Sequence, residues 1–293
     1  MSTPPPIRPA KTKPKPAGRP KPTTLKPTSR NVSAPKKDFT VEPWTGAGEG
    51  KKILVYADFG MGKTTLTSML DNVAFIGIDD GGRLIKHPHT GADLMRVPQI
   101  ENFQDVRHVL QTPSVFDDFE TIAIDTITDL QKWALPYMFQ HVPGPKNTTC
   151  KNIEGYGYNK GYRHLYDTMR LILQDCEPLV KAGKNIVFVA QKSNIKVANA
   201  AGDDYLKEAP GLFAGNASAP SVIDCYCEWV DYIFRIGYSV LAVEEKKVIG
   251  STDRVICTDG EVHYIAKHRT PLDTEIPFEE PGDDTIWKEL FGE

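Results

Sequence analysis

Short apolar runs that end in polar residues alternate along the chain with segments of helical spacing. Four of these runs predict buried strands, and they lie in the stretches KKILVYA, NVAFIGIDD, FETIAIDTITDL and GKNIVFVAQKSN. Helical spacing separates them, around residues 65–70, 102–111, 128–141 and 159–182. Short strands joined by helices are typical of a parallel sheet that is covered on both faces. The pattern therefore predicts an α/β fold.

The pattern changes from Trp229 onward. Polar and apolar residues alternate there, as is typical of antiparallel strands, and turns are expected near Gly250 and Gly260. We therefore expect an antiparallel extension on the C-terminal side of the parallel sheet.

The first apolar run ends in a glycine-containing turn. Gly60 and Gly62 permit close backbone approach to an anion, and Lys63 supplies a cation for outer phosphates. Thr64 offers a hydroxyl to Mg²⁺. The usual phosphate-binding pattern also has glycine at Ala57, whose methyl group is tolerable if φ stays below zero. A ligand-free turn is the alternative to a nucleotide-binding loop made of Asp58, Phe59, Gly60, Met61, Gly62, Lys63, Thr64 and Thr65.

An acid follows the predicted strand Thr121–Ile124. Asp125 ends this strand at the same sheet edge as Thr64, where its carboxylate can hold Mg²⁺. We interpret Asp125 as the Walker B acid, and the alternative is a carboxylate that caps the next helix. The next residue is Thr126 and not glutamate. The base that positions an attacking water must therefore come from elsewhere.

Two acids close the second predicted strand. Asp80 is the predicted base, because an acid at this strand end can reach a water beyond the γ-phosphate. Asp79, or turn formation in the stretch DDGG, is the alternative.

The first forty residues differ in composition from the rest of the chain. They contain ten Lys or Arg and ten Pro, with Asp38 as their single acid, which predicts an extended, solvated tail. Without them, the chain's 35 basic and 38 acidic residues fall to 25 and 37, so the remainder is net acidic. A nucleic-acid partner would then contact local basic loops or the tail.

Apolar runs and cysteines bear on the compartment. No run reaches the roughly 18 apolar residues of a membrane helix, so a soluble, cytoplasmic protein without a membrane partner is expected. The five cysteines lack paired Cys-x-x-Cys spacing, which favours reduced thiols. A metal site at Cys225 and Cys227 is the less favoured alternative.

Two segments have features of a single-strand nucleic-acid contact. Pro145–Tyr166 interleaves four Lys or Arg with tyrosines, which suits phosphate attraction and base stacking. Alternatively, Tyr158, Tyr162 and Tyr166 are spaced four apart as the buried stripe of a helix. Gln191–Pro220 is expected to be a long loop, which in a compact domain is usually functional or disordered.

The order of these motifs resembles the RecA-like ATPases, and most closely the compact phage RecA-like single-strand annealing and recombination proteins. The resemblance covers about residues 50–272 and rests on the stretches ADFGMGKTT, FIGIDDGG, TIAIDTITDL, IVFVAQ and IAKHRT. The closing acid, the Asp-Thr pair and the closing glutamine make it more specific than the phosphate loop alone.

The resemblance implies further roles. Gln191 corresponds to a glutamine that senses the γ-phosphate and links it to a DNA-binding loop. Asp80 corresponds to the acid that activates water, which is usually glutamate in the family. Lys267 and Arg269 correspond to basic fingers that reach the neighbouring subunit's nucleotide site, and a solvated strand end is the alternative.

The expected fold is therefore an α/β RecA-like P-loop NTPase with a mainly parallel central sheet flanked by helices. The antiparallel C-terminal extension and a disordered N-terminal tail complete it. Its expected parts are a basic tail in 1–44, the ATPase domain in 45–275 and an acidic tail in 276–293. The expected catalytic residues are Asp80, Lys63, Gln191, Lys267 and Arg269, and the expected Mg²⁺ ligands are Thr64 and Asp125.

The expected function is Mg²⁺-dependent ATP hydrolysis coupled to assembly on single-stranded DNA, in phage-type recombination, annealing or repair. A homo-oligomeric ring or filament, a single-strand binding protein as partner and the host cytoplasm as location are implied by the resemblance. Two other classes stay open. One is a P-loop ATPase or kinase that acts on a protein or small molecule, and the other is a nucleotide-gated binding protein with little turnover.

Overall fold

The computed structural model describes residues 41, 43, 45–199, 202–244 and 247–292. The chain divides into two units, Met1–Thr45 and Gly46–Glu293. The tail predicted for residues 1–44 lies outside the described residues, apart from Val41 and Pro43. The second unit is the one described below.

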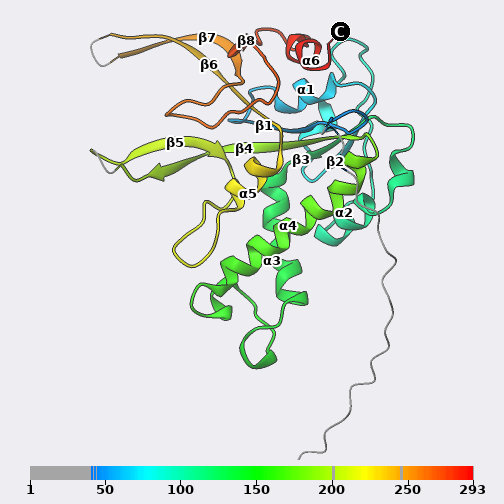
Figure 1. Cartoon of the computed structure of the whole chain (residues 1–293), viewed down its shortest axis with the longest axis vertical. Helices are drawn as coiled ribbons and strands as arrows, with labels where there is room; N and C mark the ends of the chain where they lie inside the picture. Colours follow the sequence, from blue (N-terminus) through cyan, green and yellow to red (C-terminus); the bar gives the residue numbers. More distant parts are fainter. Residues whose placement is uncertain (1–40, 42, 44, 200–201, 245–246, 293) are drawn as a thin grey trace, which may run out of the picture. The chain divides into compact units, whose positions relative to one another are not determined.

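A central eight-stranded sheet forms the middle layer of this unit (Figure 1). Its strands are β1 Lys52–Ala57, β2 Val73–Gly77, β3 Thr121–Asp125, β4 Asn185–Val197, β5 Tyr205–Pro210, β6 Tyr232–Glu244, β7 Lys247–Cys257 and β8 Glu275–Pro277. They lie in the order β2-β3-β4-β1-β6-β7-β8, with β5 beside β4. Neighbours from β2 to β6 pair in parallel, whereas β4–β5, β6–β7 and β7–β8 pair antiparallel. The predicted mainly parallel α/β fold is confirmed.

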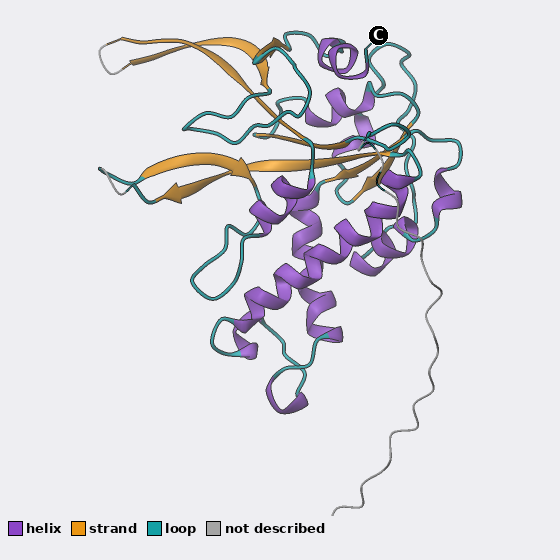
Figure 2. Cartoon of the chain, viewed as in Figure 1, coloured by secondary structure: helices purple, strands orange, loops and turns teal. Residues whose placement is uncertain are grey.

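Helices cover both faces of the sheet (Figure 2). They are α1 Lys63–Ser68, α2 Phe103–Leu110, α3 Ile127–His141, α4 Lys160–Lys181, α5 Val222–Trp229 and α6 Thr285–Phe291. Short 3-10 turns are η1 Gly81–Leu84, η2 Pro113–Phe116, η3 Pro145–Asn147 and η4 Ile153–Tyr156. Helices α2 to α5 lie on one face, and α1 and α6 lie on the other (Figure 1).

Side-chain alternation in the buried strands creates two separate cores. In β1, Leu54 and Tyr56 pack in the core beneath α2 to α5, whereas Ile53 and Val55 pack in the core beneath α1 and α6. A strand that is buried on both faces reads as a continuous apolar run, which is why the sequence identified these strands.

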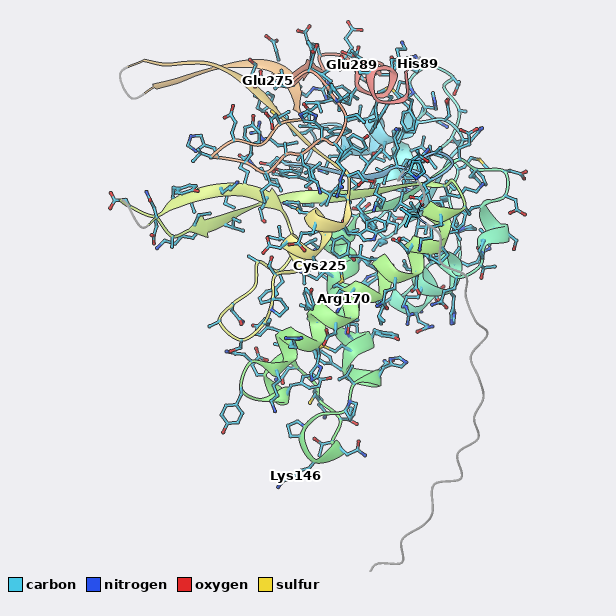
Figure 3. All side chains as sticks on the ribbon, viewed as in Figure 1. His89, Lys146, Arg170, Cys225, Glu275 and Glu289 are labelled. Carbon is cyan, nitrogen blue, oxygen red and sulfur yellow. The ribbon has the colours of Figure 1, made fainter. Side chains whose placement is uncertain are left out.

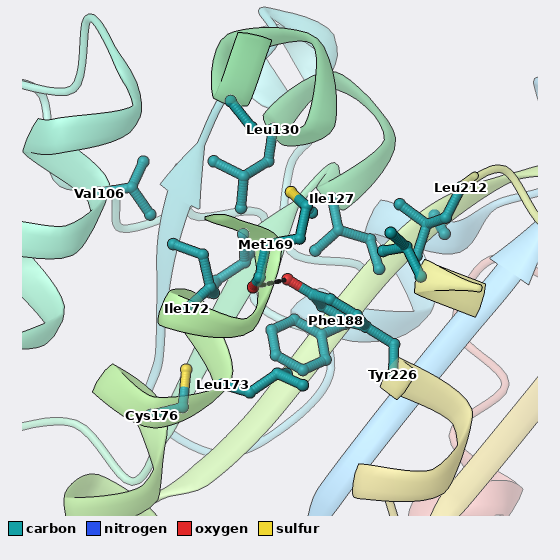
Figure 4. Close-up of a cluster of buried hydrophobic side chains, with 14 of the residues drawn as sticks. Val106, Ile127, Leu130, Met169, Ile172, Leu173, Cys176, Phe188, Leu212 and Tyr226 are labelled. Carbon is teal, nitrogen blue, oxygen red and sulfur yellow. Dashed lines mark hydrogen bonds between the residues drawn. The ribbon is translucent and has the colours of Figure 1, made fainter. Parts of the chain in front are cut away.

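The larger core fixes the strands that lead to the site. Figure 4 shows Phe188 of β4 packed near Met169 of α4 and Tyr226 of α5. The Tyr226 hydroxyl donates a hydrogen bond to the Met169 carbonyl at 3.0 Å, which satisfies this buried polar group. The strand ends beyond this core are therefore held on a rigid support.

The C-terminal residues belong to this fold, in contrast to the acidic tail expected for residues 276–293. Ile286, Trp287 and Leu290 of α6 are buried, and Trp287 Nε1 donates to the Leu66 carbonyl of α1 at 2.7 Å. The acidic composition obscured an amphipathic helix whose few apolar residues share one face.

The segment Gln191–Pro220 was expected to be a loop, but much of it is a β-hairpin. Strand β4 continues past Gln191 to Val197 and pairs with β5, with Lys192 opposite Pro210 and Val197 opposite Tyr205. Exposure alternates along this part of β4, so the strand pattern is present although polar residues dilute it.

The turn expected near Gly250 is also wrong. Strand β6 ends at Glu244 and β7 begins at Lys247, so the chain reverses earlier. Gly250 pairs with Val240 beside register shifts that mark a bulge. A glycine inside a strand often accompanies such a bulge, and the sequence signal for a turn is similar.

Cysteines, helices and possible metal ligands add three facts about the described part of the chain. All five cysteines are free thiols. None of the helices in the described part of the chain is long and apolar enough to cross a membrane. The described residues contain no group of three or more His, Cys, Asp or Glu side chains that could hold a metal ion.

Candidate nucleotide-binding site

The phosphate loop connects the end of β1 to the start of α1. Gly60 and Gly62 have φ angles of 73° and 93°, a conformation that glycine adopts without the strain a Cβ would cause. Ala57 is the last residue of the extended strand β1 and is fully buried. An extended backbone accommodates its methyl group, so the missing glycine does not disturb the loop.

Lys63 lies across this loop and is held by neutral acceptors. Its Nζ donates to the carbonyls of Ala57 and Asp58 at 3.2 and 2.9 Å and to Gln191 Oε1 at 3.0 Å. Burial lowers the pKa of Lys63, while the charges of Asp125, Asp58 and Asp79 oppose this shift. The cation is therefore positioned in the pocket by dipoles.

Thr64 and Asp125 meet at the end of β3. The Thr64 hydroxyl donates to Asp125 Oδ2 at 2.6 Å, and Asp125 is only 4% exposed. Burial raises the pKa of Asp125 to about 6, although the hydrogen bond from Thr64 opposes this. A hydroxyl and a carboxylate at this spacing fit the hard oxygen ligands that Mg²⁺ prefers. Thr126, and not Asp125, caps α3 by accepting from the Asp129 N–H at 3.2 Å.

Gln191 lies between the phosphate loop and the β4–β5 hairpin. In the parallel pairing of β1 with β4 it is the partner of Ala57. Its N–H donates to Thr128 Oγ1 at 3.0 Å, and its carbonyl accepts from the Gly211 N–H at 2.6 Å. The backbone of Gln191 is thus fixed, and its side-chain amide reaches Lys63.

The two acids after β2 share one pocket, and Asp79 also lines a second one. Asp79 lines the pocket of the phosphate loop together with Asp125 and Gln191. Asp80 lines the adjoining pocket, to which Asp79, Thr64 and Asp125 also contribute. Sequence reasoning preferred Asp80. The register pairs Gly77, the last residue of β2, with Asp125, so both acids follow the strand end beside Asp125.

Lys267 and Arg269 are not brought to this pocket. Lys267 Nζ donates to the carbonyls of Cys227 and Val230 at 2.9 and 2.6 Å, and Arg269 Nε pairs with Asp231 Oδ1 at 2.9 Å. These partners lie where α5 ends and β6 begins. Because β6 runs parallel to β1, this is the opposite end of the strands from the phosphate loop.

A second charged group lies beside the phosphate loop and was missed by sequence reasoning. Glu208 of β5 accepts from Lys192 Nζ at 3.0 Å and from Arg235 Nε at 2.8 Å. Lys192 Nζ is also 3.4 Å from Asp58 Oδ2 in the phosphate loop. Three strands contribute these residues, so no local sequence pattern could reveal the group.

Known proteins with a similar structure or sequence add to this description of the site. A KaiC-like protein from Pyrococcus horikoshii OT3 is similar in structure, with a TM-score of 0.40 and 12% identity over 80% of this chain and 88% of that chain. The flagellar accessory protein FlaH from Methanocaldococcus jannaschii has a TM-score of 0.37 and 10% identity over 79% and 86%. No curated protein matches the sequence. Residues 49–270 match the model of the AAA domain family. The chain therefore belongs to this family of P-loop ATPases.

Proposed function

We propose that this chain binds ATP with Mg²⁺ and couples its hydrolysis to action on single-stranded DNA as a homo-oligomer. One observation carries the proposal. Lys63, Thr64, Asp125 and Gln191 converge on one pocket at the carboxyl ends of three adjacent strands. The strand that delivers Gln191 then continues into the projecting β4–β5 hairpin. A change at the Gln191 amide is thereby connected to an element outside the pocket.

Each group in the pocket suits one part of a triphosphate. The Lys63 ammonium contacts only neutral acceptors within hydrogen-bonding distance among the described residues, so a phosphate oxygen can replace Gln191 Oε1 without breaking an ion pair. Thr64 and Asp125 would hold Mg²⁺, which neutralises charge on the phosphate oxygens. The released Gln191 amide would then be available to the γ-phosphate.

We assign the water-positioning role to Asp79 in this proposal. Its carboxylate lines the pocket that contains Lys63 and Asp125, and Gly81 N–H donates to its Oδ1 at 2.9 Å. Asp79→Asn should lower ATP turnover by ~10², the scale of a positioned base, with nearly unchanged ATP affinity. Asp80→Asn is the matched control. A turnover loss confined to the Asp80 variant would return the role to Asp80.

The connection between α3 and α4 supports the DNA part of the proposal. Tyr158 is 97% exposed, and the nearby cations Lys146, Lys151 and Lys160 are exposed as well. Figure 3 shows Lys146 at the far end of this connection. An exposed aromatic ring and exposed cations in one segment suit base stacking and phosphate attraction. The tyrosines do not form one buried stripe.

Two tyrosines near Tyr158 in the sequence have structural partners. The Tyr156 hydroxyl donates to the carbonyls of Met138 and Val142 at 3.1 and 2.9 Å, and the Tyr162 ring stacks on Phe213 with centroids 4.9 Å apart. Tyr162 therefore provides a matched control for Tyr158.

In the proposed oligomer, Arg269 is a better candidate than Lys267 for the residue that reaches the neighbouring subunit's nucleotide site. The Arg269 side chain is 58% exposed and has one carboxylate partner, Asp231, whereas Lys267 is held by two backbone carbonyls. Arg269 can exchange its partner for a phosphate in a neighbouring site at lower cost.

Filter binding of a labelled single-stranded oligonucleotide, with and without ATP and Mg²⁺, tests the proposal. We expect tighter binding with ATP and a faster ATPase with DNA. Tyr158→Ala should weaken binding by about 1–3 kcal/mol, the scale of one lost stacking contact. Tyr162→Ala should instead lower stability with a smaller effect on DNA. DNA that neither binds nor stimulates turnover would favour an ATPase or kinase with a protein or small-molecule substrate.

A further inference from the structure

The C-terminal segment contacts the outer side of the phosphate loop, beyond the residues that match the family. The family match ends at residue 270, and β8 begins at Glu275. Phe278 follows β8, is fully buried and packs in the same core as Met61 of the loop and Leu66 of α1. Figure 1 shows α6 on the same face of the sheet as α1, with β8 at the sheet edge.

Arg254 of β7 ties the loop to this segment. Its Nη1 donates to the Met61 carbonyl at 3.2 Å, and its Nη2 donates to the Glu279 carbonyl at 3.0 Å. The guanidinium carbon lies 4.7 Å from the centroid of the Phe278 ring, and the Phe278 N–H donates to the Arg254 carbonyl at 2.8 Å. One side chain thus joins the loop, β7 and the C-terminal segment.

Gly62 is the point where this contact meets the loop. A Cβ built on Gly62 would lie 3.0 Å from both Arg254 Nη1 and Phe278 Cε1. The guanidinium and the ring therefore rest directly against the Gly62 backbone. Gly62 also lines the nucleotide pocket together with Gly60 and Lys63, so the contact lies directly behind the pocket wall.

We propose that Arg254 and Phe278 are positioning residues that hold the phosphate loop in its anion-binding conformation before ATP arrives. This inference rests on the proposed ATP-binding function. Gly60 and Gly62 give the loop conformational freedom that binding must remove. A contact that restricts the loop in the free protein lowers this cost, so affinity rises without any contact to ATP.

The guanidinium is suited to this role because it has two donors in a fixed planar arrangement. Arg254 bridges two carbonyls from different segments, Met61 and Glu279. A lysine ammonium is a point charge on a flexible stem, so it cannot reproduce this geometry. Arg254→Lys therefore separates the bridge from the charge.

The test compares Arg254→Ala and Arg254→Lys with Arg170→Ala. Arg170 lies on the other face of the sheet, on α4, and also stacks on a ring, with its guanidinium carbon 5.7 Å from the Tyr166 centroid. Figure 3 labels Arg170 at this place. It is a control for the loss of an arginine and its ring contact.

Calorimetric titration and steady-state kinetics are the first readouts. Arg254→Ala should raise the Kd for MgATP and the KM by ~10-fold, or about 1.4 kcal/mol, with kcat at saturation within ~2-fold. Arg254→Lys should recover less than half of the lost affinity, and Phe278→Leu should shift Kd in the same direction by a smaller factor. Arg170→Ala should bind like wild type.

Hydrogen exchange of the loop amides, residues 58–64, in ATP-free protein is the second readout. Arg254→Ala should exchange faster than wild type there, and Arg170→Ala should not. If wild type binds no MgATP, the proposed function fails, and loop exchange alone still decides the positioning role. Unchanged Kd and loop exchange in Arg254→Ala would overturn the inference. A lower melting temperature with unchanged Kd and loop exchange would likewise overturn it, because that is a purely structural role.

Discussion

Two groups of charged residues lie side by side at the carboxyl ends of the strands, and they balance their charges differently. The phosphate-loop cluster comprises Lys63, Thr64, Asp125 and Gln191, and the hairpin cluster comprises Lys192, Glu208 and Arg235. In the first, the charged atoms are bound by carbonyls, a hydroxyl and an amide. In the second, the charges bind one another.

The difference indicates what each cluster is for. A buried charge that is stabilised by dipoles alone keeps part of its desolvation cost, and a ligand of opposite charge can remove this cost. A charge with an internal partner has little to gain from a ligand. Although burial opposes it, the hydrogen bonds from Arg235 and Lys192 hold the pKa of Glu208 below its usual value. We therefore expect function to depend on the first cluster and stability on the second.

Lys63→Met gives the largest expected effect on function. The variant keeps the aliphatic stem but removes the ammonium. ATP turnover should fall by at least ~100-fold, because the transferring phosphate loses a positioned charge. The free energy of unfolding should change by less than about 1 kcal/mol, because burial already disfavours the charged ammonium, and its removal offsets the loss of three hydrogen bonds and of the attraction to nearby acids. ATPase assays and urea unfolding measure the two quantities. If the free energy of unfolding falls by as much as the activation free energy of ATP turnover rises, Lys63 is mainly structural.

Arg235→Met is the matched change in the hairpin cluster. The Arg235 and Glu208 side chains are 16% and 23% exposed, so removal of the cation leaves a largely buried carboxylate. Urea unfolding should show a loss of about 2–3 kcal/mol, because Lys192 still pairs with the buried carboxylate, with ATP affinity within ~3-fold of wild type.

A double variant separates the ion pair from packing. Arg235→Met with Glu208→Gln removes both charges and should be more stable than Arg235→Met alone. If the double variant's loss of stability relative to wild type equals the sum of the losses in Arg235→Met and Glu208→Gln, the two charges do not interact and the comparison fails.

Asp125→Asn should increase the stability of the nucleotide-free protein while it abolishes Mg²⁺-dependent ATPase. The folded pKa of about 6 lies above the ordinary 3.8, so the folded chain holds this proton more tightly than the unfolded chain. The associated stability is full below about pH 4 and is lost as pH rises through about 6. Asparagine has no such dependence.

The variant's advantage should therefore grow from near zero at about pH 4 to as much as about 3 kcal/mol at about pH 8. Urea unfolding across this range, without nucleotide or metal, measures it. Equal stability of the two proteins at high pH would mean that the Asp125 carboxylate is not destabilised by burial.

Local patterns in the sequence predicted much of the sheet and the phosphate loop. Ala123 and Val187 belong to continuous apolar strands that are buried on both faces, and such strands are visible in any single sequence. The hairpin was hidden because Lys192 and Asn194 gave the segment a loop-like composition. Trp287 and Leu290 are buried by contacts with α1, which is far from α6 in the sequence, so the local pattern around α6 does not reveal their burial.

Sequence reasoning identified candidate site residues where one segment supplies them, and it did not identify groups that several segments assemble. Gly60, Gly62 and Lys63 follow one another, so their joint chemistry could be read directly. The choice between Asp79 and Asp80 stays a proposal, and it rests on which pockets the two acids line. The partners of Arg254 lie 193 and 25 residues away, and no spacing rule connects such distant positions.

Lys192→Met is the smallest effect and tests the boundary between the clusters. Lys192 Nζ contacts Glu208 at 3.0 Å and Asp58 of the phosphate loop at 3.4 Å, but the Asp58 side chain is 52% exposed. We expect about 1 kcal/mol of lost stability, because Arg235 remains to neutralise Glu208. ATP affinity should stay within ~3-fold, because solvent and salt screen the contact with Asp58.

Lys196→Met on the same hairpin is the control, since its partner Asp204 is 40% exposed and its own side chain is 72% exposed. It should change stability by less than about 0.5 kcal/mol. Urea unfolding and calorimetric titration at low and high salt compare the two variants. If Lys192→Met weakens ATP binding by more than ~10-fold at normal stability, the hairpin cluster acts on the nucleotide, and the division into a functional and a structural group is wrong. If stability falls and ATP affinity does not change, Lys192 acts as part of the hairpin cluster, and its contact with Asp58 does not contribute to ATP binding.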